Sequence, residues 1–209
     1  MKYRLVGSEM CIRDRVGAVG SGKSSLLNIL SGSSKPNRGS VLYDYEPFKK
    51  SFLGRSLIPE DVAYVNVQKI DNHTVKSLFK RSNASQVLSN YFSNLSTDKI
   101  LNSYVKKLTN GEKSAVNLSL GIEADPRVLI IDDYALFFDN KMENKFRKKL
   151  ISINKDHGTT IVLGSPNEQL LRSFCSVLIY LDNGHISKIR TGSYKSNRPN
   201  RQRSFGNKK

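Results

Sequence analysis

The sequence predicts an α/β fold whose core is a mostly parallel β-sheet, and two observations support this prediction. Short apolar runs of strand length alternate along the chain with longer segments whose apolar residues recur at helical spacing, and strands that alternate with helices form parallel sheets. One of the runs, Val128–Ile131, is apolar at every position. Such a run is typical of a strand in a parallel sheet that helices cover on both faces.

The first half of the chain predicts one helix, two strands and a helical region. Leucines at positions 26, 27 and 30 share one side of a helix over residues 24–30. A turn at 32–39 that contains glycine and proline separates this helix from a strand at 41–45, and a second strand is expected at 62–67. Residues from about 74 to 107 show weak helical periodicity with many Ser and Asn. We expect a small helical subdomain there.

The second half alternates helices and strands more regularly. Ala115, Leu118 and Ile122 share one side of a helix, and Asp125-Pro126 breaks the chain after it. Asp182-Asn183-Gly184 predicts a hairpin turn. In chain order, the elements expected are a helix at 112–124, the strand Val128–Ile131, a helix at 140–153, strands at 160–163 and 177–181 on either side of a helix near 168–174, and a last strand at 185–189.

The residues before position 16 do not suit the strand that is expected there. Arg13, Asp14 and Arg15 would bury three charges in that strand, at a cost of several kcal/mol. Residues 6–15 resemble a translated sequencing-adapter fragment. We therefore expect residues 1–15 to be a non-native segment that replaces the true N-terminus. The alternative is an unusual but native edge strand.

Charge and cysteine content restrict the setting in which the chain works. The net charge of +16 suggests nucleic acid or an anionic membrane face, but eight Lys and Arg with no Asp or Glu lie between Lys188 and Lys209. We expect residues 191–209 to be a basic, disordered tail, although lipid head groups or an acidic partner would also suit it. No apolar run is long enough to span a bilayer. Two cysteines, Cys11 and Cys175, indicate a reducing, cytosolic setting.

Residues 17–24 satisfy the pattern G-x-x-x-x-G-K-[ST] directly before the first predicted helix. The glycines let backbone N–H groups turn inward and hold phosphate oxygens at a helix N-terminus. Lys23 is expected to bridge the β- and γ-phosphates, and the Ser24 hydroxyl to coordinate Mg²⁺. The alternative is a Gly/Ser-rich turn that contains a lysine by chance. The residues predicted to bind the nucleotide are Gly17, Gly20, Ser21, Gly22, Lys23, Ser24 and Ser25.

Two carboxylates, Asp132 and Asp133, follow the buried strand Val128–Ile131. Ligands of open parallel sheets bind at the carboxyl ends of the strands. Asp132 is therefore expected to lie beside the phosphate-binding loop as a Mg²⁺ ligand. Many strands end in aspartate, so this prediction depends on the loop that precedes it in the chain.

The segment 108–113, L-T-N-G-E-K, lies between these motifs and resembles the signature of the ABC ATPase family, usually L-S-G-G-Q. As in that family, it precedes a helix and then the Walker B strand that ends in Asp132. Thr109 keeps the signature hydroxyl and Gly111 keeps the second glycine, whereas Asn110 and Glu112 depart from the pattern. A simpler interpretation is a Thr-Asn-Gly turn that caps the helix. The resemblance covers residues 16 to 189, and we assign the ATPase domain to 16–190.

The resemblance implies a P-loop NTPase core with a small helical subdomain and an N-terminal antiparallel β part, which we expect to be truncated. It also implies further site residues. Asp133 occupies the position of the catalytic glutamate, and Ser165 that of the switch histidine. Gln68 is the candidate for the Q-loop and for a further Mg²⁺ ligand, although it lies one residue later than usual. Residues 134–139 resemble the D-loop, with Ala135-Leu136 and Asp139 in the expected places.

The function that the resemblance implies is that of the ATP-binding subunit of an ABC transporter, an ATPase with ATP and Mg²⁺ as cofactors. Its sites would be composite, formed in a homodimer or with another ATP-binding subunit, so that Thr109–Glu112 faces the partner's nucleotide. The subunit would drive a separate integral-membrane permease as a peripheral protein at the cytoplasmic face. Because Asp133 and Ser165 depart from the family, we expect slow hydrolysis.

Two subgroups and two rival classes remain open at this stage. The loop sequence and Gly192-Ser193-Tyr194 resemble multidrug exporters, whereas the short stretch from Lys23 to Thr109 and residues 171–175 resemble capsule and O-antigen polysaccharide exporters, which we favour slightly. A DNA-repair or chromosome-maintenance ATPase would insert a long coiled coil or lobe between the loop and the signature, but only 86 residues separate Lys23 from Thr109. Nucleic acid is therefore not an expected partner. The other rival is a degenerate regulatory module that binds ATP with little turnover.

Overall fold

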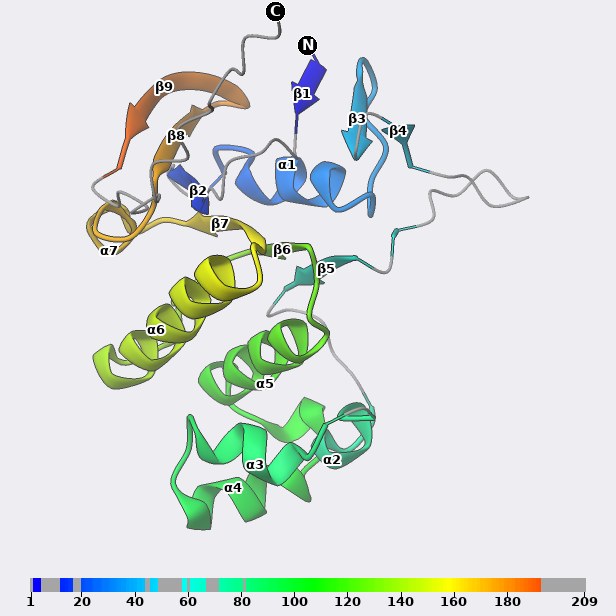
Figure 1. The fold of residues 1–209 in the computed structure, drawn as a ribbon, viewed down its shortest axis with the longest axis vertical. Coiled ribbons are helices and arrows are strands. Elements are labelled where there is room, and N and C mark those ends of the chain that lie inside the picture. The colour runs from blue at the N-terminus through cyan, green and yellow to red at the C-terminus, as the bar shows by residue number, and fades with distance from the viewer. Residues whose placement is uncertain are drawn as a thin grey trace, which may run out of the picture.

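The computed structural model describes residues 2–4, 12–16, 20–43, 46–48, 58–59, 61–66, 72–80 and 82–192. Figure 1 shows the elements in these ranges. They are, in chain order, β1 (Lys2–Arg4), β2 (Ile12–Val16), α1 (Lys23–Leu30), β3 (Ser40–Tyr43), β4 (Glu46–Pro47), β5 (Val62–Val65), α2 (Val75–Leu78), α3 (Ala84–Ser89), α4 (Asn94–Leu101), a 3-10 turn (Val105–Lys107), α5 (Asn110–Glu123), β6 (Val128–Ile131), α6 (Asn140–Asp156), β7 (Thr160–Ser165), α7 (Glu168–Arg172), β8 (Val177–Asp182) and β9 (His185–Thr191).

A six-stranded sheet in the order β5-β6-β7-β2-β8-β9 forms the core. Its strands are parallel except β9, which runs antiparallel to β8. Asn183 and Gly184 have φ angles of 45° and 78°, as the predicted hairpin turn requires. The predicted α/β fold with a mostly parallel sheet is confirmed. A second sheet, β1-β3-β4, pairs β3 with β1 in parallel and with β4 antiparallel.

Helices cover the sheet on both faces, with α1 on one side and α5 and α6 on the other (Figure 1). Strand β6 shows why its sequence is apolar throughout. Ile130 packs with Leu27 and Leu30 of α1, whereas Leu129 belongs to the cluster that contains Phe146 of α6. Because successive side chains of a strand point to opposite faces, every position of this strand needs an apolar residue.

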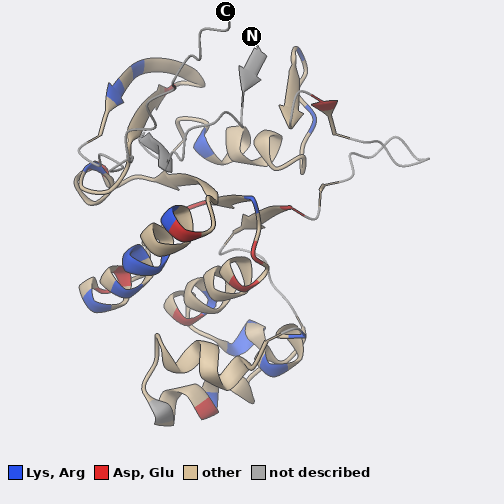
Figure 2. Cartoon of the chain, viewed as in Figure 1, with Lys and Arg blue, Asp and Glu red and all other residues tan. Residues whose placement is uncertain are grey.

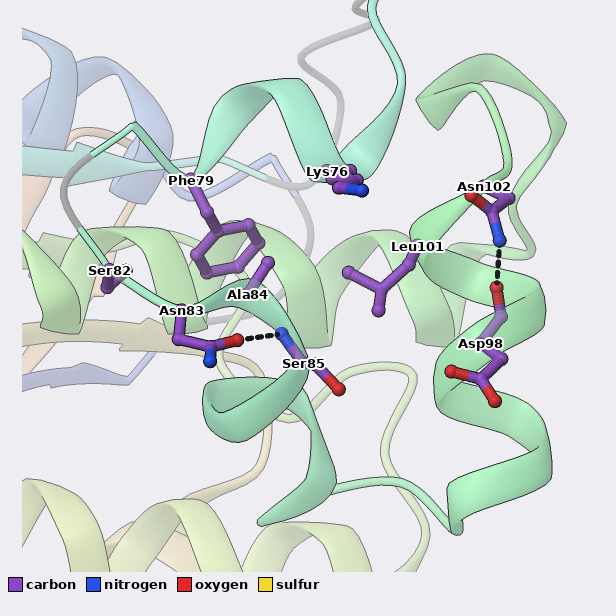
Figure 3. Close-up of a pocket in the computed structure, with 9 residues that line it drawn as sticks. All are labelled: Lys76, Phe79, Ser82, Asn83, Ala84, Ser85, Asp98, Leu101 and Asn102. Carbon is purple, nitrogen blue, oxygen red and sulfur yellow. Dashed lines mark hydrogen bonds between the residues drawn. The ribbon is translucent and has the colours of Figure 1, made fainter.

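The region between 72 and 107 packs as short helices against the start of α5, at the bottom of Figure 1. Asn83 caps α3 by accepting hydrogen bonds from Ser85 N and Gln86 N at 3.1 and 3.4 Å. A pocket of about 500 Å³ opens here between α2, α3 and α4 (Figure 3). None of the predicted site residues lines this pocket, so it is separate from the predicted nucleotide site.

Strand β2 lies inside the sheet, between β7 and β8. Asp14 pairs with Leu163 on one side and with Leu178 on the other, and both leucines are buried. The edge strand considered as an alternative is therefore wrong. Three charged residues occupy interior positions of the sheet, and the non-native origin of residues 1–15 stays a prediction.

Element boundaries differ from the expected ones at several places. Helix α5 begins at Asn110 rather than at 112, because Thr109 is its N-cap. Helix α6, whose Lys and Arg residues are blue in Figure 2, continues to Asp156, and β9 continues to Thr191, where it pairs with Val177. Strand β3 covers Ser40–Tyr43, and residues 44 and 45 of the predicted strand lie outside the described residues. Of the tail predicted at 191–209, the structure describes only residues 191 and 192.

Candidate nucleotide-binding site

The described end of the glycine-rich loop turns sharply into α1. Gly20 and Gly22 have φ angles of 85° and 93°, which side chains disfavour, so glycine is required at both positions. Gly22 is the N-cap of α1 and supplies no side-chain cap. An anion would therefore meet no capping side chain at the start of this helix. Gly17 lies outside the described residues.

The β8–β9 turn contacts the loop from the side. Gly184 N donates a hydrogen bond to the Ser21 carbonyl oxygen at 3.0 Å. A Cβ on Gly22 would lie 3.4 Å from the Gly184 Cα, so the two residues are in van der Waals contact. The bond fixes the direction of the Ser21 carbonyl and with it the plane of the peptide that carries the Gly22 N–H.

Lys23 is buried, with 6% of its surface exposed. Its Nζ donates to Ser21 Oγ at 3.3 Å. The next two residues, Ser24 and Ser25, are exposed on the first turn of α1. A lysine ammonium held at the end of a phosphate-binding loop, beside an exposed serine hydroxyl, is the arrangement that the sequence motif predicts.

Asp132 follows β6 and is 3% exposed. Its Oδ1 accepts the Asp133 N–H at 3.1 Å, and its Oδ2 accepts the Tyr64 hydroxyl at 3.4 Å. Gly164 of β7 packs beside it, and a Cβ there would lie 3.2 Å from Asp132 Oδ1 and 2.7 Å from Leu27 Cδ1. Glycine at 164 thus lets the carboxylate approach α1, the helix that carries the loop.

Asp133 is half-buried and adopts a left-handed conformation, with φ of 51°. Burial, reinforced by the neighbouring Asp132 charge, raises the pKa of the Asp133 carboxyl, and the Lys23 ammonium opposes this shift. Lys23 is therefore close enough to act electrostatically on the carboxylate. The structure brings the loop lysine and both predicted acids to the same edge of the sheet.

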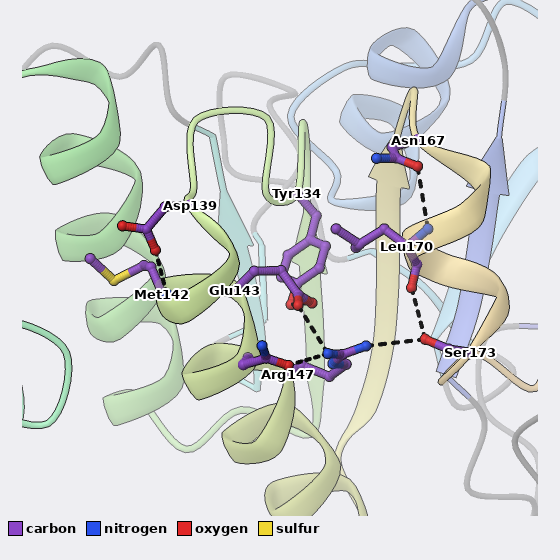
Figure 4. A network of polar contacts seen from close by, with 9 residues as sticks. Tyr134, Asp139, Met142, Glu143, Arg147, Asn167, Leu170 and Ser173 are labelled. Atoms are coloured by element: carbon purple, nitrogen blue, oxygen red, sulfur yellow. Dashed lines mark hydrogen bonds and ion pairs between the residues drawn. The ribbon is translucent and has the colours of Figure 1, made fainter.

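The turn after Asp133 is anchored by the buried side chain of Tyr134 (Figure 4). Its hydroxyl donates to Glu143 Oε1 at 3.2 Å, and Glu143 forms an ion pair with Arg147 at 3.2 Å. Ala135 also has a positive φ, 58°. Strained residues on both sides of Tyr134 are held by its burial, which fixes the position of the Asp133 backbone.

The other predicted residues lie as follows. Ser165 is buried at the end of β7, and its Oγ accepts the Asn167 N–H at 3.2 Å. Asp139 caps α6 by accepting the Met142 N–H at 2.7 Å (Figure 4). Gln68 lies outside the described residues.

Thr109 and Glu112 form a capping box at the start of α5. The Thr109 N–H and hydroxyl both donate to Glu112 Oε2 at 2.8 Å, and Thr109 Oγ1 accepts the Glu112 N–H at 3.3 Å. The capping interpretation is therefore confirmed. Thr109 and Asn110 are exposed, and a Cβ on Gly111 would lie 3.0 Å from the Phe137 carbonyl oxygen. Glycine at 111 keeps the signature segment close to the turn that follows Asp133.

Three residues that contact this site were not expected from the sequence. Tyr64, Glu143 and Gly164 bind or pack against Asp132 and Tyr134. The (i, i+4) spacing of Glu143 and Arg147 could have indicated an ion pair. A tyrosine in a buried strand could have suggested a hydroxyl that needs a polar partner.

The residues present fit ATP and Mg²⁺. Hydroxyl and carboxylate oxygens, as in Ser24 and Asp132, are the ligands that Mg²⁺ prefers. The buried ammonium of Lys23 and the uncapped start of α1 suit phosphate. The fold and these residues together define a P-loop nucleoside triphosphatase.

The family model described as ABC transporter matches residues 14–135, more than half of the chain. The chain belongs to the ABC transporter family and is an ATP-binding, ATP-hydrolysing subunit of such a transporter. Among the residues that the structure describes, no helix is long and apolar enough to cross a membrane.

Individual relatives agree with this assignment at low identity. A probable sulfate/thiosulfate import ATP-binding protein of Chlorella vulgaris is 26% identical over 200 residues, which cover 88% of this chain and 81% of that protein. A spermidine/putrescine import ATP-binding protein of Mycoplasma capricolum is 24% identical over 196 residues, 88% of this chain and 54% of that protein. A dimeric bacterial ABC transporter cassette has the same fold, with a TM-score of 0.74 at 21% identity over 88% of this chain and 86% of that one.

Proposed function

We propose that this chain binds MgATP in pairs of ATP-binding subunits, as a homodimer or with a second such subunit, and that closing of the pair drives a separate integral-membrane permease at the cytoplasmic face. The observation that carries this proposal is that the signature segment is exposed, apart from the sheet edge that holds the phosphate-binding residues. The phosphate-binding residues lie at one edge of the sheet, whereas Thr109 and Asn110 are exposed at the start of α5. Leu136 and Phe137 beside this segment are also exposed, at 47% and 42%. Exposed apolar side chains next to a motif support contact with a second molecule.

Within this proposal each group at the sheet edge has one task. Lys23 and the uncapped N–H groups of α1 bind phosphate oxygens. Ser24 and Asp132 hold Mg²⁺, which neutralises charge on the phosphates when it is bound. Asp133 orients and deprotonates the attacking water. Ser165 supplies a hydroxyl where the family has an imidazole, and Gln68 is proposed as a further ligand on the Mg²⁺ side.

Sedimentation with and without MgATP tests the composite site. We expect a monomer without nucleotide and a dimer with it. Thr109→Arg should keep ATP binding by the monomer and prevent the dimer, because a bulky cation replaces the hydroxyl at the facing phosphate. Ser93→Arg is the matched control, since Ser93 is the exposed N-cap of α4. An ATP-dependent dimer of Thr109→Arg as stable as the parent would contradict the proposal.

For the transported substrate, we infer that the transporter exports a polysaccharide. A teichoic acids export ATP-binding protein of Bacillus cereus is 26% identical over 176 residues, which cover 82% of this chain and 30% of that protein. The compact sequence between Lys23 and Thr109 supports the same subgroup. Identifying the membrane protein that crosslinks to this subunit in native membranes tests the inference. An exporter permease is expected, and a permease that works with an external solute-binding protein would contradict it.

We also propose that residues 1–15 are not native. The support is the occurrence of Arg13, Asp14 and Arg15 at interior positions of the sheet. Sequencing the genomic locus tests the proposal. Codons for residues 1–16 that continue without interruption in the native gene would contradict it.

A further inference from the structure

The carboxylate of Asp132 is oriented by a hydrogen bond from outside its own strand. The Tyr64 hydroxyl, on β5, donates to Asp132 Oδ2 at 3.4 Å, while Oδ1 accepts the Asp133 N–H at 3.1 Å. Each oxygen therefore has one fixed donor. A carboxylate held at both oxygens cannot rotate freely, so the direction in which its remaining lone pairs point is set.

The hydroxyl of Tyr64 can serve only one acceptor, and its other neighbour is a donor. Asn66 Nδ2 donates to the Tyr64 hydroxyl oxygen at 3.3 Å. A tyrosine hydroxyl ordinarily loses its proton only at about pH 10. The hydroxyl is therefore protonated at neutral pH. Because it accepts from Asn66, its single proton is directed to Asp132.

The chain of polar contacts continues to the signature helix. Asn117 of α5 donates through Nδ2 to the Asn66 carbonyl oxygen at 3.3 Å. One turn further on, a Cβ on Gly121 would lie only 2.4 Å from Val65 Cγ2, so glycine there lets α5 pack closely on β5. Helix α5 begins directly after its N-cap Thr109, the first residue of the signature turn. A displacement of α5 on the sheet would thus change the hydrogen bond between Asn117 and Asn66.

We propose that Tyr64 is a positioning residue that orients Asp132 toward Mg²⁺, and that Asn66 and Asn117 connect this carboxylate to the signature helix α5. The proposal rests on the MgATP binding proposed above. Strand β5 would then not only pair with β6 in the sheet but also orient a Mg²⁺ ligand. The position of α5, which carries the signature, then influences how firmly the same chain holds its metal ion.

ATP affinity measured by titration calorimetry in Mg²⁺ and in EDTA tests the role of Tyr64. Tyr64→Phe removes only the hydroxyl and should weaken MgATP binding about fivefold to tenfold, as expected for the loss of one ordinary hydrogen bond. Affinity for ATP in EDTA should stay within about twofold of the parent. Tyr104→Phe is the matched control, because Tyr104 is 45% exposed and far in sequence from Ser24 and Asp132. Equal losses with and without Mg²⁺, or no loss at all, would overturn the proposal.

Two further comparisons separate positioning from general destabilisation. In the Asp132→Asn background, Tyr64→Phe should cause no additional loss of MgATP affinity, since the group that it orients is gone. Asn117→Ala should weaken MgATP binding about twofold to threefold, again without effect in EDTA. Unchanged MgATP binding by Asn117→Ala would remove the connection to α5. Failure of the parent protein to bind ATP more tightly with Mg²⁺ than in EDTA would instead contradict the function proposed above.

Urea unfolding without nucleotide gives a readout independent of ATP. The effects of Tyr64→Phe and Asp132→Asn on the free energy of unfolding should be non-additive, because the two side chains share one hydrogen bond. Additive effects would show that the bond contributes nothing in the free protein and would overturn the proposal.

Discussion

The phosphate edge of the sheet and the signature end of α5 satisfy their polar groups in opposite ways. Lys23, Asp132 and Ser165 are 6%, 3% and 1% exposed. Asp132 binds the hydroxyl of a residue 68 positions away, so it depends on the assembled sheet. Thr109 bonds within one helical turn, to Glu112, and remains exposed. The residues proposed to bind phosphate are thus positioned within a single chain, whereas the segment proposed to meet a second molecule is exposed.

Removing the lysine of the phosphate-binding loop should weaken ATP binding without affecting the signature end of α5. This is the largest effect that we expect. Lys23→Ala deletes a buried cation whose charge-assisted hydrogen bonds are proposed to hold the phosphates, and ATP affinity should fall by about a hundredfold or more. Titration calorimetry with MgATP measures the loss. Thr109→Ala, in the signature, is the control and should leave ATP binding by the monomer unchanged. Equal losses for both variants would mean that the two regions do not act separately.

Restoring the family residues at the phosphate side should raise the rate of hydrolysis. The Asp133 side chain is one methylene shorter than glutamate, and a misplacement of about 1 Å can cost about a hundredfold in rate. Ser165 lacks an imidazole that would donate to the developing charge. We expect slow turnover by the parent and an increase of about tenfold to a hundredfold for Asp133→Glu with Ser165→His.

Steady-state ATPase assays of the parent, both single variants and the double variant measure this change. ATP affinity should stay close to that of the parent, because neither position belongs to the loop. A parent that already turns over several times per second, and that the substitutions leave unchanged, would contradict slow hydrolysis.

The same comparison explains what could be predicted from the sequence. Lys23, Ser24 and Asp132 could be predicted as site residues because each belongs to a local motif, and the order of strands and helices predicted the fold that the structure confirms. The contact between Tyr64 and Asp132 could not be predicted, since it exists only because β5 pairs with β6. The limits of α2, α3 and α4 were not predicted, because serines and asparagines in that region obscure the helical period.

A substitution in the signature should alter dimerisation of the subunits without changing ATP binding by the monomer. Glu112→Gln keeps an acceptor for the capping box and removes a negative charge where the partner's phosphates are proposed to bind. The ATP-dependent dimer should become about threefold to tenfold tighter, and less so at high salt. Sedimentation at several protein concentrations measures the dimerisation constant. Glu123→Gln, at the other end of the same helix, is the matched control and should have little effect.

The smallest expected effect concerns the ionisation of Asp133. Its pKa is raised by burial and by Asp132, so the folded protein holds the proton more tightly than the unfolded chain does. The free energy of unfolding is therefore lowered at a pH above the raised pKa. This cost disappears below about pH 3.9, the ordinary value for aspartate, where the carboxyl is protonated in both states.

Asp133→Asn removes that cost and should raise the melting temperature by about 1–2 °C at pH 7, measured by differential scanning calorimetry without nucleotide. The difference from the parent should shrink as the pH falls toward 4. Asparagine also tolerates the left-handed conformation at this position, but a gain from that source would persist at every pH. Asp98→Asn, on the exposed surface of α4, is the control. A gain for Asp133→Asn that does not change with pH would show that burial of the carboxylate costs the fold nothing.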